Sequence, residues 1–406
     1  MTTIINNENK KLNVPNLRFP EFQGEWEKMR LDAFTERVMR KNKSNQSRLP
    51  LTISAQYGLV DQITFFNKVV ASTDLSNYYL LKKGEFAYNK SYSSDYPWGA
   101  IKRLDNYDQG ALSSLYICFA PQDNVVSDFI LQYFESPKWH KGISEIAVEG
   151  ARNHGLLNVA VQDFFHTYHY VPKDKKEQIK ISKLLMLLDE RISTQNKIIE
   201  DLKKLKSAII EKHYSQAPKQ TAIIADLGEP FSVGNLAKDD LTEPGMPCVI
   251  YGELFTTYGE NISQIESHTN KTDGMVLSKK GDLLFPSSTT VDAMSLIAPS
   301  VINVDGVILG GDMFGIHVSH NYNAQYLSYY FNHIAKRQLA KFAKGSTIIH
   351  LHYADIEKAK LLLPSLEEQN RMAKCLMSLD AKINVENMFI CLLNSQKTYL
   401  LRQMFI

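Results

Sequence analysis

A heptad-like alternation of apolar and polar positions runs from Pro172 to Tyr214, with no glycine and no proline after the first residue. The apolar positions recur at alternating three- and four-residue steps or at multiples of them: Leu185, Leu188, Ile192, Ile199, Leu202 and Ile209. This spacing predicts a long α-helix that buries one narrow stripe against another helix. At 1.5 Å per residue the helix would be roughly 60 Å long, which is more than a compact domain needs.

A second stretch with the same pattern runs from Pro364 to Ile406. Leu188-Asp189 recurs as Leu379-Asp380, so the two stretches are offset by 191 residues (380 − 189). Glu177-Gln178 likewise recurs as Glu368-Gln369. The sequence therefore contains two related helices, and we expect them to pack along each other.

Polar interruptions of the stripe recur at the same offset, Gln195 at Glu386 and Lys206 at Lys397. Two unrelated amphipathic helices would not share such interruptions, so we interpret the pattern as an internal duplication with a pseudo-two-fold axis. Gln195 and Glu386 would lie near the middle of the seam, where a polar layer specifies register. The predicted seam comprises Leu185, Leu188, Ile192, Gln195, Ile199, Leu202, Leu376, Leu379, Ile383, Glu386, Ile390 and Leu393.

The regions that precede the two helices also resemble each other. Leu81–Ser91 resembles Leu277–Ser288, Phe129–Glu135 resembles Tyr326–Asn332, and Leu156–Pro172 resembles Ile349–Pro364. Their short apolar runs, broken by Gly, Asn and Asp, predict an α+β chain with two mixed α/β domains. Within the first domain we expect strands at Gly84–Tyr88 and Leu115–Phe119 and a helix at Val125–Glu135. The predicted organisation is a disordered tail at 1–14, a first domain at 15–171, a helix at 172–214, a linker at 215–220, a second domain at 221–363 and a helix at 364–406.

The composition is that of an ordinary globular protein, with 44% apolar and 22% charged residues among 406 and a formal net charge of +2. Such a small net charge does not decide for or against nucleic acid, because local patches do. The chain has no signal-peptide pattern and no apolar run of about 18 residues, so a cytoplasmic location is expected. The four cysteines, Cys118, Cys248, Cys375 and Cys391, form no CxxC pair and are expected to be reduced, the last two near the packing face of the second helix.

The sequence contains no recognisable catalytic or metal-binding motif. The nearest string to a phosphate-binding loop, Ala343–Thr347, has the wrong order and lacks the upstream glycine. There is no GxGxxG after a strand, no Asn/Asp-Pro-Pro-aromatic string of an amino-methyltransferase, and no HExxH or zinc-spaced Cys/His set. The pairs His166/His169, His317/His320 and His350/His352 have no acidic companions at a sensible spacing in the sequence and are expected to be structural or surface histidines. We therefore expect no catalytic residue, metal or cofactor in this chain.

Clusters of basic, amide, hydroxyl and aromatic side chains point to DNA binding. Lys and Arg neutralise phosphates, while Arg, Asn, Gln and Ser form hydrogen bonds with base edges. Each cluster alone is more typical of a solvated loop, but their presence in both domains favours DNA. The predicted residues of the first domain are Arg40, Lys41, Lys43, Arg48, Gln56, Tyr57, Asn89, Lys90, Tyr92, Trp98, Arg152, Asn153 and His154. Those of the second domain are Tyr251, Thr256, Thr257, Tyr258, Ser287, Ser288, Thr289, Lys344, Ser346 and Thr347.

The layout resembles the DNA-specificity subunit of type I restriction–modification systems, of the kind found in low-GC Gram-positive bacteria. The resemblance rests on the lead-in Pro15–Trp26 (PNLRFPEFQGEW) and on two long helices that each carry P-x(3–4)-E-Q and L-D-x-x-I. It covers the chain from Pro15 to Ile406, although the globular domains match only in their framework.

The resemblance implies that each globular domain is a target recognition domain that reads half of a split, asymmetric DNA sequence in the major groove. It also implies that the two long helices pack as an antiparallel coiled coil that sets the spacing of the half-sites, and that two methyltransferase subunits dock on the chain. Those partners would carry S-adenosylmethionine, and restriction subunits would add ATP- and Mg-dependent translocation and cleavage. The strongest alternative is a coiled-coil scaffold whose domains bind protein, and salt-sensitive DNA binding would distinguish the two. A stand-alone enzyme is a third, more distant alternative, which turnover by the purified chain would test.

Overall fold

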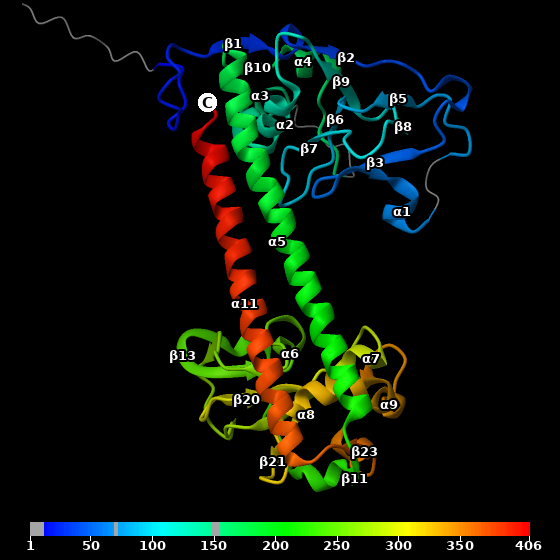
Figure 1. Cartoon of the computed structure of the whole chain (residues 1–406), viewed down its shortest axis with the longest axis vertical. Coiled ribbons are helices and arrows are strands. Elements are labelled where there is room, and N and C mark those ends of the chain that lie inside the picture. The colour runs from blue at the N-terminus through cyan, green and yellow to red at the C-terminus, as the bar shows by residue number, and fades with distance from the viewer. Residues whose placement is uncertain (1–11, 69–71, 148–154) are drawn as a thin grey trace, which may run out of the picture. The chain divides into compact units, whose positions relative to one another are not determined.

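The computed structural model describes residues 12–68, 72–147 and 155–406 (Figure 1). The chain divides into two compact units, the first comprising Met1–Gln195 and Phe389–Ile406 and the second Asn196–Met388. Each unit is a mixed α/β body attached to one part of each long helix. Most of the tail predicted at 1–14 lies outside the described residues.

The two long helices are α5 (Lys175–Gln216) and α11 (Leu366–Gln403). Helix α5 begins later than predicted because Asp174 precedes it as a cap, its side chain accepting from the Lys176 N–H at 2.8 Å. Helix α11 ends before the C-terminus, and Met404 and Phe405 turn into the core of the first unit.

The helices pack antiparallel within each unit. In the first unit Leu185 near the start of α5 shares a core with Leu401 near the end of α11, and in the second Ile210 shares one with Leu376. The predicted seam residues are all buried or half-buried. The buried ones are Leu185, Leu188, Gln195, Ile199, Leu376, Ile383 and Leu393, and the half-buried ones are Ile192, Leu202, Leu379, Glu386 and Ile390.

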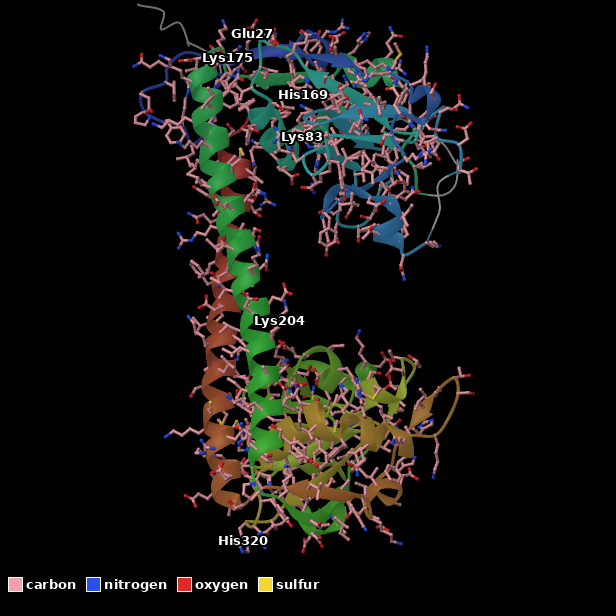
Figure 2. The ribbon with its side chains drawn as sticks, turned by 45° about the vertical axis from the view of Figure 1, so that its right-hand side comes forward. Glu27, Lys83, His169, Lys175, Lys204 and His320 are labelled. Carbon is pink, nitrogen blue, oxygen red and sulfur yellow. The ribbon has the colours of Figure 1, made fainter. Side chains whose placement is uncertain are left out.

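The described residues of the first unit form two four-stranded sheets. One has the order β2-β9-β6-β7 (Thr35–Arg37, Ile117–Pro121, Phe86–Asn89, Ala100–Arg103), and the other β4-β3-β8-β5 (Gly58–Asp61, Pro50–Ser54, Gln109–Leu112, Tyr79–Lys82). A separate pair joins β1 (Glu27–Arg30) to β10 (Tyr168–Val171), and Figure 2 marks Glu27 near Lys175, where α5 begins. The shorter helices are α1 (Gln62–Phe66), α2 (Ser127–Glu135), α3 (His140–Ile146) and α4 (Val161–His166).

The second unit repeats this plan. Its sheets are β12-β21-β17-β19-β14 (Gly228–Ser232, Met313–Val318, Asp282–Pro286, Ser300–Ile302, Asn261–Ile262) and β15-β13-β20-β16 (Ser267–Thr269, Leu241–Ile250, Ile308–Gly310, Val276–Leu277). Two further pairs are β11·β23 (Gln220–Ile223, Lys360–Leu363) and β18·β22 (Ser288–Thr289, Ile349–His350). Its shorter helices are α6 (Glu253–Thr256), α7 (Ala293–Leu296), α8 (Ala324–Tyr330), α9 (Lys336–Leu339) and α10 (Tyr353–Ile356), with a π-helical turn at Phe331–Ala335 between α8 and α9.

The duplication extends to strand direction and to single hydrogen bonds. The sheets β4-β3-β8-β5 and β15-β13-β20-β16 each contain a parallel pairing, β3·β8 and β13·β20, at the same place in the strand order. Gln178 accepts from the Val126 N–H at 2.7 Å, just before α2, and Gln369 accepts from the Asn323 N–H at 3.0 Å, just before α8. The repeated glutamine therefore ties each long helix to the start of the same short helix.

The predicted elements of the first domain agree with β6, β9 and α2. Cys375 and Cys391 were predicted near the packing face of the second long helix, and this prediction is wrong, because both are exposed. Cys118 and Cys248 are buried. Both exposed cysteines follow or precede a seam residue directly, and one residue along a helix turns the side chain by about 100° away from the seam. Nowhere in the described part of the chain is a helix both long and apolar enough to cross a membrane.

Candidate nucleic-acid interface

In the first unit, the segment that follows β6 runs beside the segment that leads into α4. Ser91 forms a β-bridge with Leu156, and the Tyr92 N–H donates to the Gly155 carbonyl at 2.8 Å. Tyr92 is 52% exposed and Lys90 is half-buried. We call residues 89–92 and 155–157 the first rim. The predicted residues Arg152, Asn153 and His154 lie outside the described residues.

The second unit has an equivalent arrangement, the second rim, formed by residues 287–291 and 344–350. Strand β18 pairs antiparallel with β22, Ser288 opposite His350. The hairpin at 344–350 is closed by two backbone hydrogen bonds between Lys344 and His350, of 2.9 and 2.7 Å. Gly345 turns it with φ +116°, a conformation that other residues rarely adopt. Two predicted clusters that are far apart in the sequence, 287–289 and 344–347, thus come together.

The rims differ in what they expose. In the second rim Ser346 and Thr347 are exposed at the hairpin tip, and Lys344 is engaged by Asp355. Ser287 and Ser288, 4% and 7% exposed, face the interior and do not present their hydroxyls to solvent. Sequence reasoning missed Val291 and Ile348, which are 73% and 50% exposed. Because apolar residues are expected inside a domain, only knowledge of the strand pairing could have placed these two at the surface.

A polar loop at 42–48 precedes β3 in the first unit. Asn42 is buried and organises the loop, because its side chain accepts from the Ser47 N–H at 2.8 Å and donates to the Ser47 carbonyl at 2.8 Å. Lys43 and Arg48 are left exposed. Two other predicted residues are engaged within the protein: Arg40 binds Glu85 at 2.7 Å, and Lys41 lies 4.3 Å from the centre of the Tyr79 ring.

The predicted residues Gln56 and Tyr57 lie at the β3–β4 turn, where Tyr57 is 68% exposed. Tyr57 packs edge-on against Phe65 of α1 at 6.4 Å, and Phe65 packs against Phe66 at 5.0 Å. Phe65 and Phe66 are 43% and 44% exposed and were not predicted. Asp61, which caps α1, and Asn67, in a left-handed conformation, mark this apolar run as a short surface helix.

The remaining predicted residues are divided between surface and framework. Thr256 and Thr257 are exposed at the end of α6. Tyr258 is half-buried, and its hydroxyl accepts from the Glu266 N–H at 3.1 Å. Tyr251 packs against the core cluster of the second unit that contains Leu254 and Leu309. Asn89 accepts from the Ser91 N–H at 2.9 Å, and Trp98 packs against the core of the first unit.

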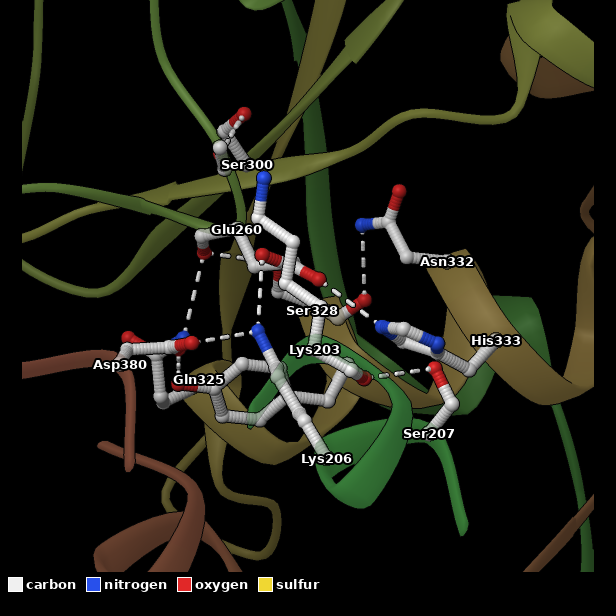
Figure 3. Close-up of polar contacts among 12 residues, drawn as sticks. Lys203, Lys206, Ser207, Glu260, Ser300, Gln325, Ser328, Asn332, His333 and Asp380 are labelled. Carbon is white, nitrogen blue, oxygen red and sulfur yellow. Dashed lines mark hydrogen bonds and ion pairs between the residues drawn. The ribbon is translucent and has the colours of Figure 1, made fainter. Parts of the chain in front are cut away.

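A buried polar network joins the second unit's α/β body to both long helices (Figure 3). Lys206 of α5 donates to Asp380 of α11 at 2.6 Å and to Glu260 at 3.1 Å, and His333 Nε2 lies 2.9 Å from a Glu260 oxygen. Burial would raise the pKa of Glu260, but the hydrogen bond with His333 and the charge of Lys206 outweigh it and lower the pKa to about 2. This carboxylate is charged and paired at neutral pH, as a structural group would be.

His169, marked in Figure 2, is the most deeply buried of the six paired histidines that the sequence singled out. Its ring nitrogens lie 2.9 Å from the Tyr133 hydroxyl and 2.7 Å from the Thr167 hydroxyl. Burial lowers its pKa to about 3, so the ring stays neutral and acts as part of the core. Among residues 12–68, 72–147 and 155–406, no three His, Cys, Asp or Glu side chains are grouped so that they could hold a metal ion.

Comparisons with known proteins agree with the duplicated fold. Residues 223–390 match the family model for the type I restriction modification DNA specificity domain. The specificity subunit of the type I restriction enzyme MjaVIII from Methanocaldococcus jannaschii is 24% identical over 304 residues, which are 68% of this chain and 69% of the relative.

Two solved structures share the fold along nearly the whole chain. The type I restriction–modification S subunit from M. genitalium has a TM-score of 0.58 at 16% identity and covers 97% of this chain and 99% of its own. The second comes from a structure described as the basis of complex assembly and conformational transition of the type I R-M system. It has a TM-score of 0.56 at 14% identity, and the match covers 94% of this chain and 97% of that one.

The duplicated α/β units on paired helices share the fold of a type I restriction–modification S subunit, and the second unit carries the matched DNA specificity domain. Over about two thirds of its length the chain is thus similar to a type I restriction enzyme specificity subunit, and specificity subunits are the non-catalytic part of those enzymes. The narrower likeness to subunits of low-GC Gram-positive bacteria stays a prediction.

Proposed function

We propose that the chain gives a type I restriction–modification complex its DNA specificity, each unit reading one half of a bipartite, asymmetric target. The observation that carries this proposal is the rim. Both units place a paired rim at equivalent positions, Ser91 corresponding to Ser288 at an offset of 197 (288 − 91), yet the exposed side chains differ. One framework with two unlike surfaces is suited to reading two unlike sequences.

The chemistry of the exposed residues suits DNA. Lys43 and Arg48 in the first unit supply cations for phosphates, and Tyr92, Ser346 and Thr347 supply groups that bond or stack. Val291 and Ile348 in the second rim supply apolar surface for thymine methyl groups.

The helix pair would act as the spacer between half-sites, since α5 continues without a break from the first unit into the second. A continuous helix is stiff, whereas a flexible linker would leave the spacing undefined. Readers of two half-sites on one face of a duplex must lie about 34 Å apart, or a multiple of that distance.

Two methyltransferase subunits would dock on exposed apolar stripes of the long helices. Val385, Leu392 and Tyr399 of α11 recur every seven residues and are 58%, 66% and 58% exposed. On α5, Ile198 and Leu205 share a second stripe at the same spacing. An exposed heptad stripe is the surface on which a further helix packs. The partners would carry S-adenosylmethionine, and restriction subunits would bring ATP and Mg.

The experiment that tests this function is DNA binding by the chain assembled with a cognate methyltransferase subunit, measured by fluorescence anisotropy at several salt concentrations. We expect tight binding to one duplex sequence, with log K falling linearly as log [salt] rises. A coiled-coil scaffold for protein partners is less favoured, because a DNA specificity domain matches the second unit. Absence of sequence-dependent, salt-sensitive binding would favour that scaffold.

A further inference from the structure

The repeat places the same acid–cation pair in the first turns of both long helices. Glu177 and Lys180 of α5 correspond to Glu368 and Arg371 of α11 at the offset of 191 (368 − 177 and 371 − 180). The surroundings of the two pairs differ: a segment of the chain covers the first pair and leaves the second pair partly exposed.

In the first unit, the lead-in Pro15–Trp26, which precedes β1, binds both residues of the pair. Arg18 donates to both oxygens of Glu177, from Nε at 2.7 Å and from Nη2 at 2.8 Å, and the Trp26 indole N–H donates to the same carboxylate at 3.2 Å. Lys180 lies 4.5 Å from the centre of the Phe19 ring and pairs with Glu21. The segment Arg18–Glu21 therefore satisfies both members of the pair, and Glu177 is only 2% exposed.

In the second unit, no segment among the described residues covers the pair in this way. The chain passes from α5 to β11 through only Ala217, Pro218 and Lys219. Glu368 and Arg371 bind each other at 2.7 Å, with side chains 34% and 67% exposed.

A cavity of about 470 Å³ lies beside this second pair. Its lining includes His213, Pro218, Lys219, Ser365, Glu368 and Arg371. His213 is 9% exposed, and its Nε2 has no hydrogen-bond partner among the described residues. A buried polar atom without a partner is costly, and a ligand in the cavity would offer it one.

We propose that this cavity binds a peptide segment of another protein, one that carries an arginine followed by an aromatic and an acidic residue, as Arg18–Glu21 do. The arginine of the peptide would replace Arg371 as the partner of Glu368 and form a bidentate ion pair with it. Arg371 would then turn to the aromatic ring and the acidic group, as Lys180 does in the first unit. A carboxylate at the centre of the site disfavours phosphate ligands and favours a cationic side chain. This docking site goes beyond DNA reading and does not depend on it.

The probe is a fluorescent synthetic peptide with the sequence of residues 12–26, added to the full-length chain. We expect saturable binding with one peptide per chain. Glu368→Gln should weaken it at least about tenfold, the effect of losing one charge-assisted hydrogen bond. The matched control Glu367→Gln removes the same charge from a neighbouring exposed residue and should leave binding unchanged. A peptide with alanine in place of Arg18 should bind as weakly as the Glu368→Gln chain binds the original.

A photoreactive group at the Phe19 position of the peptide identifies the site. Cross-links to 213–220 or 365–371 support the proposal. Cross-links around Glu177 would mean that the peptide has only displaced the chain's own lead-in, and the proposal would be wrong. It would equally be overturned by the lack of saturable binding, or by equal affinity for the wild-type chain and Glu368→Gln.

Discussion

Lys206 of α5 donates to Asp380 of α11 at 2.6 Å, and the duplicated partners of these two residues form the same ion pair in the first unit, between Lys397 and Asp189. Each aspartate also accepts a hydrogen bond from the short helix behind it, Asp380 from Tyr329 at 2.5 Å and Asp189 from Gln132 at 2.9 Å. The repeated lysines and aspartates thus join three helices in each unit. This explains why Lys206 and Lys397 interrupt the apolar stripe. Lys206 also donates to Glu260, in addition to its bond with Asp380.

Replacing Lys206 with methionine leaves Asp380 and Glu260 without their cation inside the protein. Breaking a buried ion pair in this way costs roughly 3–5 kcal/mol, so we expect a large loss in the free energy of unfolding of the second unit. The Lys206 side chain is 8% exposed, whereas that of Lys204, on the same helix, is 68% exposed. Lys204→Met is therefore the control and should change nothing measurable. Denaturant unfolding checks both, and an equal, small effect of the two variants would contradict the structural role of Lys206.

The second unit should lose stability in acid. The folded-state pKa of Glu260 is about 2, below the ordinary value of 4.5. A lowered carboxyl pKa contributes stability that is fully present above about pH 4.5 and is lost as the pH falls towards 2. The difference corresponds to about 3 kcal/mol at most. Glu260→Gln should flatten the pH dependence of unfolding in that window, and Glu266→Gln, an exposed control, should not. An unchanged slope in Glu260→Gln would refute the assignment.

Lys43 and Arg48 should act on phosphates rather than on bases. Each phosphate contact contributes about 0.9 to the slope of log K against log [salt]. The double variant Lys43→Ala/Arg48→Ala should therefore lower the magnitude of the slope by about 1.8 and weaken binding to all sequences alike. Lys141→Ala serves as the control, because the Lys141 side chain on α3 is 86% exposed. If the double variant altered sequence preference and kept its slope, the two residues would read bases instead.

The hairpin tip of the second rim should affect only one half-site. Ser346→Ala/Thr347→Ala removes two exposed hydroxyls without touching the backbone bonds that close the hairpin. Loss of one good base contact costs about 1–3 kcal/mol of discrimination at that position. Binding to a panel of single-base variants of the target measures this. Thr242→Ala, exposed on β13, should have no effect. A change in both half-sites would count against separate reading by the two units.

Periodicity made the framework predictable. The seam and the 191-residue offset depend on local spacing, so α5 and α11 could be placed within a few residues from the sequence. Their ends could not, because Asp174 and the burial of Phe405 decide them through specific contacts.

The candidate site was less predictable, because exposure in the rims depends on pairing between distant segments. Ser288 is buried because it pairs with His350, 62 residues away (350 − 288), and Ile348 is exposed because the hairpin carries it outward. No local pattern contains that information. Phe65 and Phe66 were missed for a related reason, since an apolar run after a strand is usually core.

The most direct test of the central claim is long-read methylation mapping in cells that contain this chain and its methyltransferase partner, with and without four residues inserted after Thr194 in α5. We predict a split, asymmetric methylated motif that requires the chain. In the insertion variant, whose helix is about 6 Å longer, both half-sites should persist while the spacing between them changes or recognition fails. A continuous motif, or an unchanged spacing in the insertion variant, would contradict the account.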